Sequence, residues 1–296
     1  MANPVQSLEI KEQAQDIAAT LPSLVLSAQR VADVVAQGIH GRHRAGSGEE
    51  FWQYRQYQQE DAARSIDWRR SARSDQVYIK QREWEIPQTV WLWCDHSLSM
   101  RFSSDAAWPE KMYRAEILLL ALVILLTKAG ERVGLIGSEM MPSSARSTVN
   151  LMAAHLITQR TAPSDSIPNI DALSSNSRLV MISDFFLPTA IFQQNILNFA
   201  KRSGQGCLLQ ILDPAEEEFD WQGRILFQGL ENNQKILIEK TQSIRALYRH
   251  RLLAHRLELE NTCRSLGWSF LHSHTNKPAV STLIALYGLL NKQGKS

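Results

Sequence analysis

Cysteine is scarce in this sequence of 296 residues: Cys94, Cys207 and Cys263 are the only three, and they stand far apart. No two of them form a C-x-x-C pair, which argues against a zinc site and against a disulfide framework. Charge of one sign is also lacking, because 32 Lys and Arg balance 30 Asp and Glu to a net charge of +2. Such a balance does not by itself indicate a nucleic-acid-binding protein.

Long hydrophobic runs are absent as well. The longest, residues 117–126, is too short to span a bilayer and predicts a buried core helix instead. Acidic and basic residues interrupt the first 16 positions, and no basic segment precedes an apolar one, so no signal peptide is expected. We therefore expect a cytoplasmic protein without a membrane span.

Several enzyme signatures are missing. The C-terminal Gly-Lys-Ser resembles the end of a phosphate-binding loop, but Leu289 stands where that loop needs its first glycine. Neither G-x-S-x-G nor H-E-x-x-H occurs. Ser97 stands where an aspartate-nucleophile phosphatase needs a second Asp, and no base is evident for Ser97 or Ser99 as a nucleophile. These absences predict that the chain is not an enzyme.

The pattern of residues divides the chain into three regions. Residues 1–40 form a helical segment, with apolar side chains at helical spacing over 7–37. Residues 41–88 begin with a glycine-rich basic loop and continue as a segment rich in Arg, Tyr and Trp, with an alternating strand over 77–85. Residues 89–296 form the main domain, with a β-hairpin inserted at about 215–240.

The main domain alternates buried strands and helices. Its strands lack polar alternation, which is typical of a parallel sheet covered by helices on both faces. The sequence therefore predicts an α/β, Rossmann-like fold. Strands are expected at 89–94, 132–137, 178–183, 206–212 and 268–271, and helices at about 104–128, 145–157, 189–203, 241–266 and 279–291.

Polar residues follow two of these strands directly. Asp95, Ser97 and Ser99 form a D-x-S-x-S turn after the first strand, and Asp184 follows the third. Ligands of such sheets bind beyond the carboxyl ends of the strands, and Mg²⁺ prefers carboxylate and hydroxyl oxygens. The four residues are therefore a candidate magnesium site with an open position for a carboxylate of another protein. Alternatively, the turn residues only cap the backbone that follows them.

The Arg-rich segment offers a second candidate surface. Tyr and Trp interleaved with Arg are enriched at protein–protein interfaces and also stack on nucleic-acid bases. The acids among them would repel phosphate, which disfavours nucleic acid, and could hold arginines in ion pairs that pin the segment. Structural pinning and a protein interface both remain open. The candidate partner-binding residues are Arg55, Asp61, Arg64, Asp67, Trp68 and Arg73.

Taken together, these motifs resemble a known bacterial family. The D-x-S-x-S turn followed by a strand ending in Asp looks like a von Willebrand factor A domain with its metal-ion-dependent adhesion site. The flanking motifs resemble the family called domain of unknown function 58, and with the turn they extend from about residue 41 to residue 290. Those flanking motifs are Gly48-Glu49-Glu50-Phe51, Tyr54-Arg55-Gln56-Tyr57, Asp61, Arg64, Ile66-Asp67-Trp68, Ala72-Arg73 and Leu212-Asp213-Pro214-Ala215-Glu216.

The resemblance implies a von Willebrand A-like fold and work beside a MoxR-type AAA+ ATPase in assembling or maturing client proteins. It also implies Mg²⁺ at Asp95, Ser97, Ser99 and Asp184, and a further Thr-like ligand for which Ser166 is the candidate. We therefore expect a non-enzymatic adaptor that grips an acidic side chain through Mg²⁺. The rival hypotheses are a metal-dependent hydrolase that uses the same acids and a metal-free scaffold.

Overall fold

A computed structural model of the chain describes residues 4–40, 51–58, 61, 66–73, 76–82, 88–160, 177–186, 194, 196–201, 204–229 and 234–292. The chain divides into two compact units. The large unit combines residues 1–38 with residues 88–296, and the small unit spans residues 39–87. Ser166 and Arg64, two of the predicted site residues, lie outside the described residues.

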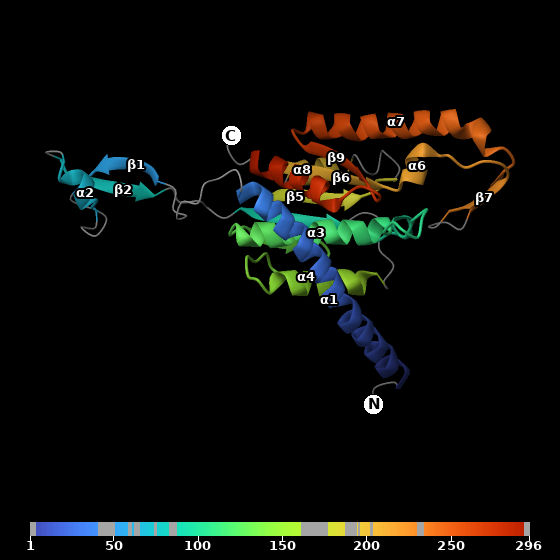
Figure 1. The fold of residues 1–296 in the computed structure, drawn as a ribbon, viewed down its shortest axis with the longest axis horizontal. Helices are drawn as coiled ribbons and strands as arrows, with labels where there is room; N and C mark the ends of the chain where they lie inside the picture. Colours follow the sequence, from blue (N-terminus) through green and yellow to red (C-terminus); the bar gives the residue numbers. More distant parts are fainter. Residues whose placement is uncertain are drawn as a thin grey trace. The chain divides into compact units, whose positions relative to one another are not determined.

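A five-stranded parallel sheet forms the centre of the large unit (Figure 1). Its strand order is β4-β3-β5-β6-β9, so the strand that comes first in the chain lies between its two successors. This order reverses direction at β3, as in doubly wound Rossmann-like folds. The strands are β3 (Thr89–Cys94), β4 (Arg132–Leu135), β5 (Arg178–Ser183), β6 (Gln205–Leu212) and β9 (Ser269–His274).

The predicted α/β class is confirmed by this sheet. An antiparallel bridge from Ser143 to Val133 of β4 continues the sheet beyond its outer parallel strand. The order and the bridge are consistent with a von Willebrand A type of Rossmann-like fold. The order places the carboxyl ends of β3 and β5 side by side, at the point where the connections diverge.

Helices cover both faces of the sheet. Helix α3 (Lys111–Lys128) contacts four of the strands, and α4 (Thr148–Gln159) and α8 (Ala279–Lys292) pack on α3. Helix α7 (Thr241–Ser265) packs on β6 and β9, and its residue Leu259 shares a core cluster with Trp91 and Trp93. Figure 1 shows α7 and α3 on opposite sides of the sheet.

Helix α3 is the predicted core helix, and the whole run 117–126 is buried. Among the described residues, no helix is both long enough and apolar enough to cross a membrane. The predicted start of α3 at Ser104 or Asp105 is wrong, because the helix begins at Lys111 with Glu110 as its N-cap. Ser104 donates to Asp213 instead, which holds this segment out of the helix.

The N-terminal helix α1 (Pro4–His40) covers the predicted range 7–37. It belongs to the large unit through residue 38, and it buries Leu24, Ala28 and Val35 completely. Its exposed ion pair from Asp33 to Lys128 of α3 measures 3.0 Å. These contacts attach the second half of α1 to the large unit.

The predicted hairpin insertion is present as β7 (Ile225–Gln228) paired antiparallel with β8 (Lys235–Ile238). A short helix, α6 (Pro214–Glu218), precedes it and was not predicted. The C-cap of α6 is Phe219, which adopts a left-handed backbone (φ 45°) and stacks on Tyr248 of α7 at 4.3 Å. The ring of Phe219 thereby anchors the start of the insertion on α7.

The small unit contains an antiparallel pair of strands, β1 (Phe51–Gln56) and β2 (Tyr78–Arg82), and the short helix α2 (Trp68–Ser71). The strand prediction for residues 77–85 is confirmed over β2, while β1 and α2 were not predicted. Asp67 caps α2 by accepting a hydrogen bond from the backbone N–H of Arg70 at 3.1 Å.

Candidate functional site

The structure brings four predicted site residues together at the carboxyl ends of β3 and β5. The hydroxyls of Ser97 and Ser99 lie 3.1 Å apart, and the Ser99 hydroxyl donates to Oδ2 of Asp184 at 2.8 Å. Asp95, on the same turn, and Asp184 are both buried. The sheet order therefore joins two segments that lie 85 residues apart in the sequence.

Asp95 organises the turn rather than facing outward. Its Oδ1 accepts from the backbone N–H of Ser97 at 2.8 Å, and its Oδ2 accepts from the Ser183 hydroxyl at 2.6 Å. Burial raises the pKa of the Asp95 carboxyl above its ordinary value. The alternative that this motif merely caps its own turn thus describes Asp95 well. It does not describe Ser97, because the Ser97 side chain makes no capping bond to the short 3₁₀ helix at Leu98–Met100.

Phe185 holds the second side of the site in place. Its backbone is left-handed (φ 55°), which is uncommon for a non-glycine residue and carries strain. The Ser183 hydroxyl accepts from the backbone N–H of Phe185 at 2.9 Å, and a ring nitrogen of His255 contacts the Phe185 carbonyl at 2.9 Å. This strained residue turns the chain directly after Asp184. His255 on α7 is therefore part of the support of the site.

A fully buried lysine completes the cluster. Lys111, at the start of α3, donates to Oδ2 of Asp184 at 2.8 Å and to Oε1 of Glu216 at 2.6 Å. Burial disfavours its charged form, but the attraction of Asp184 and Glu216 outweighs that cost and raises the pKa of Lys111. We call Asp95, Ser97, Ser99, Lys111, Asp184 and Glu216 the strand-end cluster.

The acids after β6 also belong to this region. Asp213 and Glu216 form a capping box around the first turn of α6. Asp213 is buried and accepts from the backbone N–H and the hydroxyl of Ser104 at 3.0 and 2.5 Å. Asp213 therefore ties α6 to the segment before α3, and Glu216 is held beside Lys111.

Negative charge exceeds positive charge in this region. Asp184 and Glu216 share the ammonium of Lys111, and Asp95 and Asp213 are further buried carboxyls after β3 and β6. Burial raises the pKa of Glu216 despite its bond to Lys111, and the nearby charge of Asp184 adds a smaller effect in the same direction. A further cation, or a proton, would relieve this excess.

The oxygen atoms fit a small hard cation in type and in spacing. Neighbouring ligands of an octahedral Mg²⁺ with bonds of about 2.0–2.1 Å stand about 3 Å apart. The distance from Ser97 to Ser99 is 3.1 Å and that from Ser99 to Asp184 is 2.8 Å. Within the described part of the chain, no group of three or more His, Cys, Asp or Glu side chains is placed to hold a metal. A metal here would depend on hydroxyls as much as on carboxylates.

A second buried network lies behind the D-x-S-x-S turn. One ring nitrogen of His96 contacts the Cys94 carbonyl at 3.0 Å, and the other contacts Glu116 of α3 at 3.3 Å. Glu116 also accepts two hydrogen bonds from Arg160, and although burial opposes it, this pairing lowers the pKa of the Glu116 carboxyl. Both nitrogens of His96 are thus engaged away from Ser97 and Ser99.

The candidate partner-binding residues of the small unit are arranged differently. Arg55 of β1 donates to Asp61 at 2.7 Å, and Arg73 is exposed. This hydrogen bond lowers the pKa of Asp61. Asp67 caps α2, and Trp68 is 67% exposed. The ion pair and the helix cap both lie within the small unit, whereas Trp68 stays a predicted partner-binding residue.

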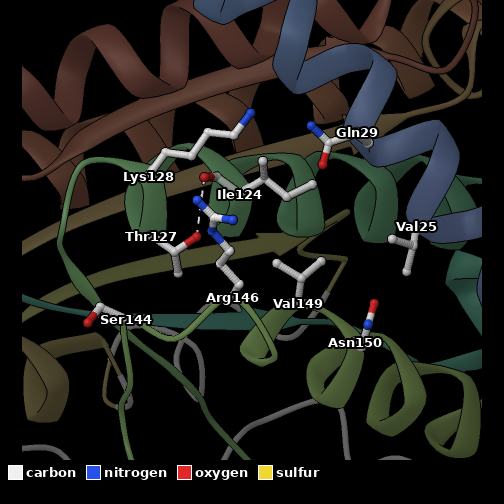
Figure 2. Close-up of a pocket in the computed structure, with 9 residues that line it drawn as sticks. All are labelled: Val25, Gln29, Ile124, Thr127, Lys128, Ser144, Arg146, Val149 and Asn150. Carbon is white, nitrogen blue, oxygen red and sulfur yellow. Dashed lines mark hydrogen bonds between the residues drawn. The ribbon is translucent and has the colours of Figure 1, made fainter.

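Figure 2 shows a pocket elsewhere in the large unit, with a volume of about 630 Å³. Gln29 of α1, Ile124 of α3 and Asn150 of α4 are among its lining residues. Arg146, from the loop before α4, points its guanidinium into this space. The pocket shares no residue with the strand-end cluster.

Two comparisons with known proteins give relatives of low similarity. Uncharacterized proteins of Mycobacterium tuberculosis and Mycobacterium bovis are each 27% identical over 282 residues, covering 90% of this chain and 88% of theirs. A conserved hypothetical protein BatB from Bacteroides thetaiotaomicron aligns in structure with a TM-score of 0.42 and 13% identity, over 71% of this chain and all of that one. An aerotolerance-related membrane protein from Bacteroides fragilis aligns with a TM-score of 0.41 and 14% identity, over 69% and 99%.

A third comparison assigns the family. The model of the family described as "Protein of unknown function DUF58" matches residues 53–258. This range includes the small unit from Gln53 onward and the strands β3, β4, β5 and β6 of the parallel sheet. The match covers well over half of the chain and spans both Asp95 and Asp184. The chain therefore belongs to the DUF58 family.

Proposed function

We propose that the chain is a non-enzymatic interaction module that binds an acidic side chain of a partner protein through Mg²⁺ at the ends of β3 and β5. The observation that carries this proposal is the set of three oxygens from Ser97, Ser99 and Asp184, with spacings of 3.1 and 2.8 Å. The excess negative charge around them is the second support.

Each residue of the site has a separate task in this proposal. Ser97, Ser99 and Asp184 would hold the ion, and Asp95 keeps the two hydroxyls on one side of the turn through its bonds to Ser97 and Ser183. The bound ion would supply the positive charge that attracts a carboxylate. Ser97 has little exposed surface and Ser99 is part-buried, so the partner would insert a single side chain rather than a broad surface.

The partner in this proposal is a MoxR-type AAA+ ATPase, as the family resemblance implied. ATP hydrolysis would then lie in the partner, because this chain lacks the phosphate-binding loop. The chain would act as the adaptor that presents client proteins during assembly or maturation. The small unit, with the exposed Trp68, offers a second surface for either contact.

A metal-free scaffold is the second candidate, and one observation favours it. Lys111 already places a cation 2.8 Å from Asp184. In that case the cluster would be a structural ion-pair network, and partner binding would not depend on Mg²⁺.

Affinity capture on the full chain tests the proposal. The lysate proteins retained in Mg²⁺ and in EDTA would be compared for the wild type, for Ser97→Ala/Ser99→Ala, and for the matched control Ser265→Ala/Ser281→Ala. The hydroxyls changed in the control donate to backbone carbonyls three residues earlier in the chain. We expect an AAA+ ATPase that the wild type and the control retain only in Mg²⁺ and that the site variant loses. Retention by all three in EDTA would contradict the metal contact, and no ATPase in any sample would contradict the adaptor role.

A further inference from the structure

We propose that Lys111 is an internal cation that competes with the divalent ion for Asp184, so that the site fills only when a partner carboxylate helps to hold the ion. This inference rests on the proposed function and concerns how that site is regulated. Lys111 has no exposed surface, and its ammonium bridges Asp184 and Glu216 at 2.8 and 2.6 Å. An ammonium so deeply buried is held by these two carboxylates.

The competition follows from the atom that both cations need. Oδ2 of Asp184 accepts from the Ser99 hydroxyl at 2.8 Å and from the ammonium of Lys111 at 2.8 Å. A carboxylate oxygen offers about two lone-pair positions, so these donors fill Oδ2. The Ser99 hydroxyl can rotate its proton away and turn an oxygen lone pair to the ion. An ammonium has only protons to offer, and it must move away before a divalent ion binds at Oδ2.

The other oxygen of Asp184 does not provide an easy alternative. Oδ1 accepts from the backbone N–H of Phe186 at 3.1 Å, in the strained segment that follows β5. Using that oxygen instead would disturb the backbone that Phe185 and His255 hold in place. Oδ2 is therefore the atom at which the ion and Lys111 meet.

Glu216 gives Lys111 a place to remain after it leaves Asp184. The shorter of its two ion pairs is the one to Glu216, which the capping box of α6 fixes. The rings of Phe102 and Phe186 lie 5.9 and 5.4 Å from the ammonium and favour a cation at this position. The lysine thus has two arrangements, one bridging both acids and one paired with Glu216 alone.

This competition makes occupancy conditional. Without a partner, the ion must displace Lys111 from Asp184 and gains only the serine and aspartate oxygens. A partner carboxylate adds a charged ligand and shifts the balance toward the ion. Metal and partner would then bind cooperatively, and the free protein would hold Mg²⁺ weakly.

Calorimetric titration of the full chain with MgCl₂ tests this inference. Lys111→Met alone would leave two buried carboxylates unpaired and risks unfolding, so the test variant is Lys111→Met/Glu216→Gln, which removes one charge of each sign. The amide oxygen introduced by Glu216→Gln would still accept the capping-box bond that Glu216 accepts from the backbone N–H of Asp213. The matched control is Lys128→Met/Asp33→Asn, which removes an exposed ion pair between Lys128 of the same helix and Asp33 of α1. Circular dichroism confirms the fold of each variant.

We expect the test variant to bind Mg²⁺ at least about tenfold more tightly than the wild type, a difference of about 1.4 kcal/mol, with the control unchanged. Equal or weaker binding by the variant would overturn the role of Lys111 and leave the metal site itself standing. Binding by the variant alone would support the competition and show that the lysine excludes Mg²⁺ from the free wild-type protein. Binding by neither would overturn both this inference and the magnesium site of the proposed function.

Discussion

The strand-end cluster and the small unit both contain ion pairs, but burial gives these pairs different consequences. Lys111 and Asp184 are almost fully buried, with side-chain exposures of 0% and 3%, whereas Arg55 and Asp61 are 35% and 18% exposed. A buried ion pair is expensive to break because each charge has lost its water, while an exposed pair contributes little. Substitutions in the strand-end cluster should therefore lower the free energy of unfolding strongly, whereas substitutions at the ion pair of the small unit should change it little.

The comparison also separates two ways of building an interaction surface. The strand-end cluster collects its polar groups from β3, β5, α3 and α6, so each is positioned by the fold of the large unit. The small unit presents Trp68 from a four-residue helix capped by Asp67. A partner that binds at the cluster would have to match the fixed positions of these polar groups. The affinity of a partner that binds at Trp68 would depend on how much apolar surface the contact buries.

The largest loss of stability is expected for Lys111→Met. Loss of this ammonium leaves Asp184 and Glu216 buried without their cation, and should lower the free energy of unfolding by about 3–5 kcal/mol. Urea denaturation measures the change. The exposed Lys128→Met on the same helix serves as control and should leave the midpoint nearly unchanged. Similar urea midpoints for both variants would show that burial of an ion pair does not determine how much it contributes to the free energy of unfolding.

An intermediate loss of stability is expected for Glu217→Gln. Glu217 pairs with Arg256 at 2.7 Å and with His274, and despite an opposing burial cost these partners lower the pKa of Glu217 to about 2. Because the folded pKa lies below the ordinary 4.5, this stabilisation is complete above about pH 4.5 and is lost as the pH falls toward 2. Partial exposure screens the pairs, so we expect roughly 1–2 kcal/mol at pH 7.

Denaturation of wild type and Glu217→Gln between pH 2 and pH 7 checks this prediction. The two curves should converge at low pH, where the wild-type carboxyl is protonated as well. Curves that stay parallel over the whole range would mean that Glu217 does not titrate as its ion pairs require.

A smaller loss of stability is expected for Asp61→Asn in the small unit. The bond from Arg55 lowers the pKa of Asp61, but the pair is open to solvent and to salt. Thermal melting should be nearly unchanged, and any difference should disappear in about 1 M NaCl. A large loss of stability would show that this pair pins the small unit more firmly than its exposure implies.

The smallest effect on stability, together with a large effect on binding, is expected for Trp68→Ala. Trp68 is 67% exposed, so its removal costs the folded chain little packing. If the small unit contacts the partner, capture of the ATPase should fall several-fold, while Val77→Ala, a change at an apolar residue 40% exposed in the same unit, should leave capture intact. Unchanged capture by both variants would remove the small unit from the interface.

Much of the fold was predictable from the sequence because its strands are continuous apolar runs with clear ends. Residues 89–94 and 178–183 were predicted to the residue, and the rule that ligands gather beyond parallel strand ends brought Asp95 and Asp184 together. The hairpin was also predictable from its two short apolar arms. Short elements such as β1 and α2 were missed because their stability depends on packing within the small unit.

Lys111 and its pairing with Glu216 were missed for a different reason. Lys111 stands at the boundary of a helix whose start was placed too early, and nothing in its neighbours indicates that its ammonium is buried. Its two partners lie 73 and 105 residues away. The capping box from Asp213 to Glu216 is a local signal that would have revealed α6, but the pairing of Glu216 with Lys111 depends on the tertiary fold.

A crystal structure of the Lys111→Met/Glu216→Gln variant grown in MnCl₂, with anomalous data at the manganese edge, tests the central claim most directly, because Mn²⁺ takes the same oxygen ligands as Mg²⁺ and no lysine competes for Asp184 in this variant. We predict one anomalous peak in contact with the hydroxyls of Ser97 and Ser99 and with Asp184. A strand-end cluster of this variant without a peak at saturating Mn²⁺ would contradict the account.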